Sequence, residues 1–215
     1  MSGFSDDGQW WWDGRTWVAT AQVVLPDLPK TEFEKSGGVE LARKARLAGR
    51  GRFWRESVLW GLIGVSPVNR RGFDDYRTWT LEQVALATTY LLGSDEPLVA
   101  AEVSVYDLWD AWSRDLAIAV TAAHVIVFRI DSVDGQPRWV GLAGRAADVN
   151  IKTYPGLLKR FWPTLVVTRR NAKWLIQGFH GGKFNPGPVL KAWRQAVKHT
   201  ERGEGSNPPG SVGPG

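Results

Sequence analysis

The stretch Asp115-Leu-Ala-Ile-Ala-Val-Thr-Ala-Ala-His-Val-Ile-Val-Phe128 decides the fold, because it reads as two short apolar strands joined by a tight turn. The first strand is predicted at residues 116–120, the turn at 121–124 and the returning strand at 125–130. Strands joined by so short a turn pair antiparallel. The second half of the chain is therefore predicted to contain an antiparallel sheet.

A period of two continues on both sides of this hairpin, which is typical of strands. Further strands are predicted at residues 98–106, 138–142, 147–153, 164–169 and 173–178. A closing helix is predicted at 188–200, with one apolar face made by Val189, Leu190, Trp193, Ala196 and Val197. Short strands at this spacing predict an α+β fold with a small antiparallel sandwich or barrel.

Helical signals precede the strands. Thr80 and Gln83 form a capping box for a helix at 81–92, and Gly93 is placed to end it. Residues 39–64 also repeat at helical spacing, with a kink expected near the glycines at 49 and 51.

The N-terminus is predicted to be a tryptophan-rich hairpin. The run Gln9-Trp-Trp-Trp12 favours a strand, Asp13-Gly14 is a turn signal, and Thr16-Trp-Val18 is the return strand. A lone hairpin is marginal in water, so its rings must pack on the main domain or on a partner. The predicted organisation is a hairpin at 1–20, a proline-paced linker at 21–37, a helical segment at 38–93, the main domain at 94–202 and a disordered tail at 203–215.

Two family resemblances follow from these residues. The capped helix, the seven or so short strands and the final helix resemble bacterial pleckstrin-homology-like (PH-like) domains over about residues 81–200. In those domains a hydrophobic strand ends in Val-Thr, turns and returns as an Ile/Val/Phe strand, as at 115–128, and the preceding Asp95-Glu-Pro-Leu-Val99 is also similar. The resemblance implies a seven-stranded, strongly bent barrel closed by the C-terminal helix. It implies no catalytic residues.

The second resemblance is carried by Trp11-Trp-Asp-Gly-Arg-Thr-Trp17. It is similar to the W-W-D-G-x-x-W core of a short tryptophan-rich domain of unknown function, found at the N-termini of many actinobacterial proteins. The match covers about residues 8–20. The upstream Gly-Trp-Tyr-x-Asp-Pro half of that domain is replaced here by Ser5-Asp-Asp-Gly8.

Composition argues against catalysis. The chain has no cysteine, which excludes a disulfide framework, a thiol nucleophile and thiolate zinc sites. Its three histidines have no second ligand at metal spacing, and no P-loop or Gly-x-Ser-x-Gly motif is present. We predict a non-enzymatic protein with no cofactor, no metal and no small-molecule substrate. Residues 1–20 lack the features of an export signal, and no run of about 20 apolar residues occurs, so we expect a cytoplasmic location.

Charge is segregated along the chain. The chain has a net charge of +5. Residues 94–135 carry eight acidic and two basic side chains, whereas residues 136–202 carry thirteen basic and two acidic side chains. Such segregation can orient a charged partner, although solvated basic faces give the same pattern. The predicted anion-contacting residues are Arg43, Arg46, Arg50, Arg52, Arg55, Lys159, Arg160, Arg169, Arg170 and Lys173.

A protein partner is the predicted ligand. The loop at 107–115 is acidic and would repel a phosphate headgroup, but it carries two tryptophans. The predicted partner anchors are Trp11, Trp12, Trp17, Trp109 and Trp112. Packing of Trp109 and Trp112 into the domain is the open alternative. We therefore expect a protein-binding or scaffold module. The alternatives are a nucleic-acid binder that uses the basic helix 43–55 and a peripheral binder of anionic membranes.

Overall fold

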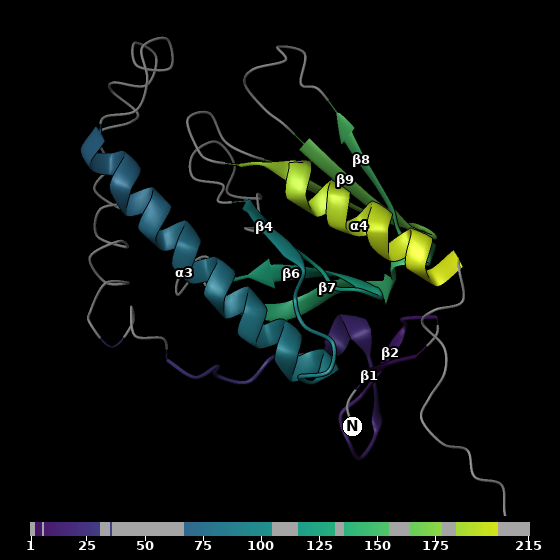
Figure 1. Cartoon of the computed structure of the whole chain (residues 1–215). Coiled ribbons are helices and arrows are strands. Elements are labelled where there is room, and N and C mark those ends of the chain that lie inside the picture. The colour runs from purple at the N-terminus through teal and green to yellow at the C-terminus, as the bar shows by residue number, and fades with distance from the viewer. Residues whose placement is uncertain are drawn as a thin grey trace, which may run out of the picture.

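The protein is described from a computed structural model, which covers residues 3–5, 7–30, 35, 67–104, 116–131, 136–154, 164–177 and 184–201. For residues 67–76 it describes the backbone alone. The described residues form an α+β fold with two antiparallel sheets, a small N-terminal sheet and two α-helices of several turns (Figure 1).

The first sheet contains the predicted hairpin. Its strand order is β4 (Ala100–Ser104), β5 (Leu116–Val120), β6 (His124–Ile130) and β7 (Pro137–Arg145). In the β5–β6 turn the Thr121 N–H donates to the His124 carbonyl at 2.9 Å, and the His124 N–H donates to Thr121 Oγ1 at 2.8 Å. The antiparallel pairing predicted for residues 115–130 is therefore confirmed.

The second sheet and the final helix follow. After the 3₁₀ turn η2 (Ala146–Asp148), β8 (Asn150–Tyr154), β9 (Thr164–Arg169) and β10 (Ala172–Gln177) pair in the order β10-β9-β8, and α4 (Pro186–Glu201) follows them. The expected strand at 147–153 begins later because η2 turns the chain first. Within the described ranges no strand pairing joins the two sheets, so the closed barrel expected from the sequence is not seen.

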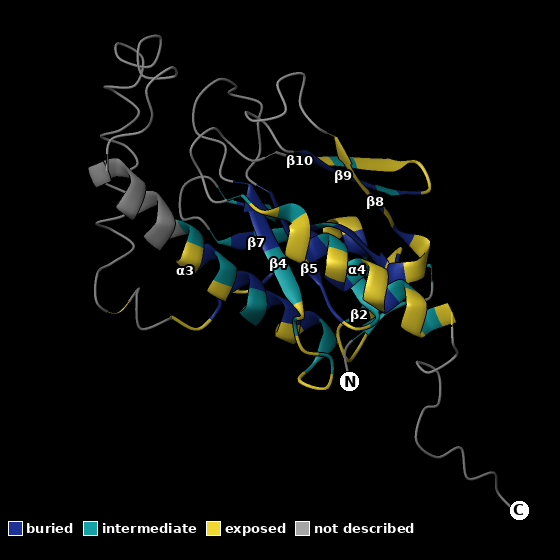
Figure 2. Cartoon of the chain, turned by 45° about the horizontal axis from the view of Figure 1, so that its top comes forward, coloured by how far each residue is buried: buried dark blue, intermediate teal, exposed yellow. Residues whose placement is uncertain are grey.

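Both faces of the first sheet are buried (Figure 2). All five residues of β5 are buried, and they alternate between two cores. Ala117 and Ala119 face a core shared with the helix α3 (Pro67–Leu92), whereas Ile118 and Val120 face a core shared with the second sheet and α4. This explains why the deciding stretch is apolar without interruption. The alanines lie on the side that α3 covers, where small side chains let a helix approach closely.

The start predicted for the helix at 81–92 is wrong. The helix begins at Pro67, a residue favoured in a first helical turn, and it runs through the expected cap. Thr80 and Gln83 are both fully buried within it, so they do not form a helix-capping box. The predicted end is confirmed, because Gly93 has a φ of 83° and its N–H donates to the Thr89 carbonyl at 2.8 Å.

A buried carboxylate fixes both helices to the first sheet. Glu102 in β4 is 1% exposed and accepts hydrogen bonds from Arg77 of α3, at 3.1 Å from Nε and 2.6 Å from Nη2. Its other oxygen accepts from the Asn185 N–H, 2.9 Å away, just before α4. A buried charge requires such partners. Glu102 therefore sets where α3 and α4 lie relative to β4.

The N-terminal sheet is docked against the end of α3 (Figure 1). It consists of β1 (Gly3–Phe4), β2 (Trp10–Trp12) and β3 (Trp17–Ala19). The β2–β3 hairpin is confirmed, with the Arg15 and Thr16 N–H groups donating to Asp13 Oδ1 at 2.6 and 2.7 Å. β1 was not predicted. Trp11 is 6% exposed, and its indole Nε1–H donates to the Leu91 carbonyl at 3.1 Å.

The segment predicted as a linker packs on the domain over its described part. After the 3₁₀ turn η1 (Thr20–Gln22), the buried side chains of Val23, Leu25 and Leu28 join the same core as Trp11. The Leu25 N–H donates to the Arg138 carbonyl of β7 at 2.9 Å. The N-terminal sheet is thereby held to the domain through Trp11 and through the segment that follows β3.

We predict that Trp11→Ala lowers the free energy of unfolding by about 3–5 kcal/mol, because it leaves a cavity and an unsatisfied Leu91 carbonyl. The control Trp17→Ala removes a ring that is 53% exposed and should cost less than about 1 kcal/mol. Urea unfolding followed by circular dichroism measures both values. Equal costs for the two variants would contradict the docking of Trp11.

Candidate functional site

The hairpin presents aromatic side chains on the face opposite Trp11. Successive residues of a strand point to opposite faces, so Trp10 and Trp12 lie away from Trp11, and Trp17 pairs directly with Trp12. Trp10 is 45% exposed and Trp17 is 53% exposed. The Trp12 and Trp17 rings lie 5.5 Å apart between centroids. We call Trp10, Trp12 and Trp17 the tryptophan face.

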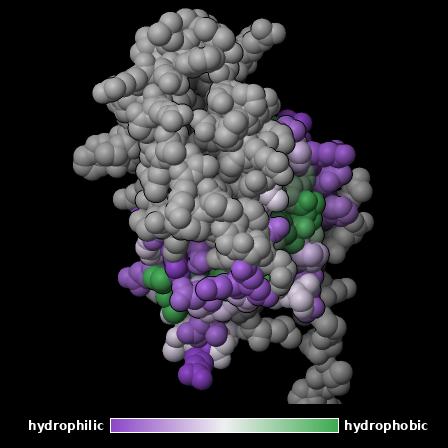
Figure 3. Space-filling view, turned by 90° about the vertical axis from the view of Figure 1, so that its left-hand side faces the viewer, coloured by the Kyte–Doolittle hydropathy of each residue, from purple (hydrophilic) through white to green (hydrophobic). Residues whose placement is uncertain are grey.

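The predicted anchors therefore divide into groups. Trp11 belongs to the core, Trp12 and Trp17 lie together on the tryptophan face, and Trp109 and Trp112 lie outside the described residues. Sequence reasoning missed Trp10, although strand alternation places it beside Trp12. On the face shown in Figure 3, the described surface is mainly hydrophilic, with small separate apolar patches.

Of the predicted anion-contacting residues, three are described. The remaining ones, Arg43, Arg46, Arg50, Arg52, Arg55, Lys159 and Arg160, lie outside the described residues. Lys173 is exposed on β10 and does not line a described hollow with Arg169 and Arg170. Arg169 ends β9 and Arg170 begins the turn to β10, as the predicted hairpin tip required.

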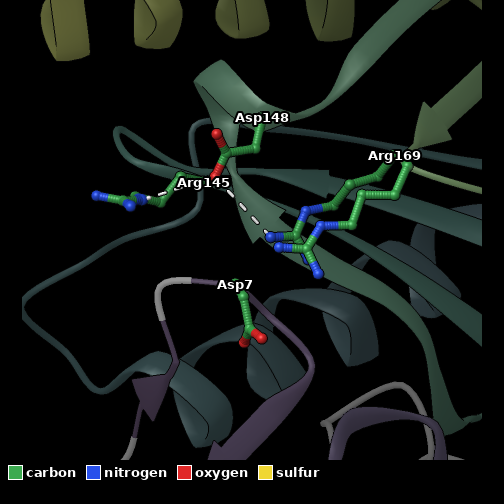
Figure 4. Close-up of a pocket in the computed structure, with 5 residues that line it drawn as sticks. Asp7, Arg145, Asp148 and Arg169 are labelled. Carbon is green, nitrogen blue, oxygen red and sulfur yellow. Dashed lines mark ion pairs between the residues drawn. The ribbon is translucent and has the colours of Figure 1, made fainter.

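Arg169 and Arg170 line a hollow between the N-terminal sheet and the main domain (Figure 4). It measures about 420 Å³, and we call it the arginine hollow; its lining residues are Asp7, Arg145, Asp148, Arg169 and Arg170. They come from the β1–β2 turn, the end of β7, η2 and the β9–β10 hairpin. Sequence reasoning missed Asp7, Arg145 and Asp148, because no local signal shows that these separate segments meet.

The Arg169 guanidinium is enclosed by backbone. The side chain is 7% exposed, and its Nη1–H donates to the Ala143 carbonyl at 2.8 Å. A Cβ atom at Gly144 would lie 2.4 Å from Arg169 Nε, and one at Gly8 would lie 2.3 Å from Nη1. Both glycines therefore leave room that the guanidinium fills, and Gly8 also brings the β1–β2 turn against β7.

Charges of both signs meet in the arginine hollow. Burial is the main cause that lowers the pKa of Arg169; Asp148 and Asp7 oppose the shift, while Arg170 and Arg145 add to it. The hydrogen bonds from the Ser5 hydroxyl and the Gln9 N–H lower the pKa of Asp7. Asp7 is therefore ionised at neutral pH, and Arg169 stays cationic because arginine is not deprotonated in proteins.

A second polar cluster closes the β5–β6 turn. His124 Nδ1 lies 2.8 and 2.9 Å from the two carboxylate oxygens of Glu96, and the Thr121 hydroxyl donates to the same carboxylate. Burial raises the pKa of Glu96, but His124 and the Thr121 hydroxyl outweigh it, so the pKa lies below its ordinary value of 4.5. The cluster ties the segment after α3 to the first sheet.

The chain matches no protein-family model, and no curated protein matches it. Among the described helices, none has the length and the apolar run that crossing a bilayer requires.

We predict that Gly8→Ala lowers the free energy of unfolding by about 1–3 kcal/mol, because an alanine at a φ of 57° is strained and its methyl group meets the Ala143 carbonyl. The matched control is Gly3→Ala, whose added Cβ has no atom within 4 Å. Urea unfolding compares the two. A loss of the same size at Gly3 would contradict the close contact at Gly8.

We also predict that Glu96 stabilises the fold at neutral pH and that this contribution is lost when the pH is lowered. Its pKa is lowered by folding, so its contribution is present above the unfolded pKa and is lost as the pH falls through the folded value. Between about pH 5 and pH 3, the free energy of unfolding should fall more steeply for the wild type than for Glu96→Gln. Parallel pH profiles from urea unfolding would contradict this role.

Proposed function

We propose that this chain is a cytoplasmic, non-enzymatic binding module of PH-like type, which docks a protein partner through the tryptophan face. One observation carries the proposal: Trp10 and Trp17 stay exposed on a hairpin whose middle tryptophan, Trp11, is buried and hydrogen-bonded to α3. The tryptophan face is thus held in place by Trp11, which lies between Trp10 and Trp12 on β2.

The chemistry of the tryptophan face supports a protein ligand. Indole rings offer a large apolar area and an N–H donor, and tryptophan is enriched among the residues that dominate binding energy at protein interfaces. Because the sheet is fixed to the domain, binding would order few additional groups. The exposed Asp13 and Arg15 at the hairpin tip would supply part of a polar rim.

The strand order supports the PH-like assignment. An antiparallel sheet of four strands, a second sheet of three strands and a closing helix follow one another in the described residues. This is the order that the PH-like resemblance implies. α4 packs into the core that both sheets share, and Trp193 Nε1–H donates to the carbonyls of Ala146 and Val149, each at 3.0 Å. We interpret the two sheets as the halves of a bent barrel.

The test compares the full chain with a Trp10→Ala/Trp17→Ala double variant in affinity capture from the native host, followed by binding of the purified captured protein. We expect at least about ten-fold weaker binding by the double variant, since both rings belong to the proposed contact. Tyr154→Ala, which removes a ring that is 56% exposed on β8, is the matched control and should bind as the wild type does.

Equal binding by the double variant would contradict the proposal. So would a salt-dependent shift of labelled DNA or RNA, or sedimentation with anionic vesicles, if no protein partner is captured. Those two results would instead support the nucleic-acid and membrane alternatives.

A further inference from the structure

We propose that the arginine hollow is a binding site for the phosphate group of a small soluble phosphomonoester. The site involves Arg145, Arg169 and Arg170 and does not depend on the tryptophan face. Three observations support it: the spacing of the charges, the burial of one guanidinium and the backbone conformation of another.

The charged side chains of the hollow lie too far apart to form hydrogen-bonded ion pairs with one another. Asp148 Oδ2 lies 3.7 Å from Arg145 Nε and 3.9 Å from Arg169 Nη2, and both distances exceed a hydrogen bond. Three cations face two carboxylates, so the lining is net positive. An oxyanion beside Arg169 would accept the hydrogen bond from Nη2 that Asp148 is too far away to accept.

Arg169 holds a desolvated cation at this point. Its side chain is 7% exposed and its Nη1–H donates to the Ala143 carbonyl, while Nη2 lies 3.9 Å from Asp148 Oδ2. A buried cation is costly unless its donors are satisfied. Guanidinium groups match the oxygens of a phosphate with paired, charge-assisted hydrogen bonds, which suits a phosphate ligand.

Arg170 occupies a position that does not favour arginine. It is the first central residue of the two-residue β9–β10 turn and has a φ of 50°, where glycine is normally preferred. Strained backbone of this kind clusters at functional sites. The turn therefore holds Arg170 in an unfavourable backbone conformation beside two other arginines, which fits a role for its charge in the hollow.

The two carboxylates limit the class of ligand. Asp7 lies on the β1–β2 turn with its carboxylate bonded to Ser5 and Gln9 of that turn, and Asp148 in η2 places its carboxylate beside Arg145 and Arg169 (Figure 4). The further phosphates of a nucleic acid would be repelled by them. A volume of about 420 Å³ accommodates a small molecule with one phosphate group.

The test uses the full chain and calorimetric titration with inorganic phosphate, O-phosphoserine and glycerol 3-phosphate, at constant ionic strength set with chloride. We expect saturable binding of at least one probe by the wild type. Arg145→Gln and Arg170→Gly should each weaken it about ten-fold, because each removes charged donors. Arg170→Gly should also unfold at the same temperature as the wild type or higher, since glycine relieves the turn.

Lys191→Gln removes one exposed charge from α4, outside the lining, and should bind as the wild type does. Preference for free phosphate or for one ester identifies the source of the phosphate group. The proposal is overturned if the wild type binds no probe more tightly than about 10 mM, or if Lys191→Gln weakens binding as much as the hollow variants do. Binding to phosphate-bearing vesicles alone would overturn it as well.

Discussion

The four-stranded sheet needs apolar cover on both of its faces, and the rest of the structure follows from that requirement. β5 carries apolar side chains on both faces, and exposing either face to water would be unfavourable. The second sheet and α4 cover one face. On the other face, α3 is joined by Trp11 and by Val23, Leu25 and Leu28 from the N-terminal segment. The tryptophan-rich sheet is therefore part of the same core.

This arrangement connects the fold to both proposed sites. The burial of Trp11 turns its strand neighbours outward, which creates the tryptophan face. The same docking brings the β1–β2 turn, with Asp7 and Gly8, against Arg169 of the second sheet. The docking of the N-terminal sheet thus leaves aromatic rings exposed on one of its surfaces and brings its β1–β2 turn to the arginines of the main domain.

The sequence predicted the features that depend on local patterns. The period of two gave the strands, Gly93 gave the end of α3, and Asp13-Gly14 gave the hairpin turn. The capping box at Thr80 failed because a polar pair at the right spacing also occurs in the middle of a helix, on its buried side. β1 is too short to show a period. Arg145, Asp148 and Asp7 meet Arg169 through tertiary contacts, which no local pattern encodes.

The most direct test of this account is native-state hydrogen exchange of the full chain, followed by mass spectrometry at increasing urea. If the N-terminal sheet belongs to the common core, the amides of β2 and β3 should open with the same free energy as those of β5 and β6. Exchange of β2 and β3 at a much lower free energy, with β5 and β6 still protected, would show that the sheet detaches by itself and would contradict the account.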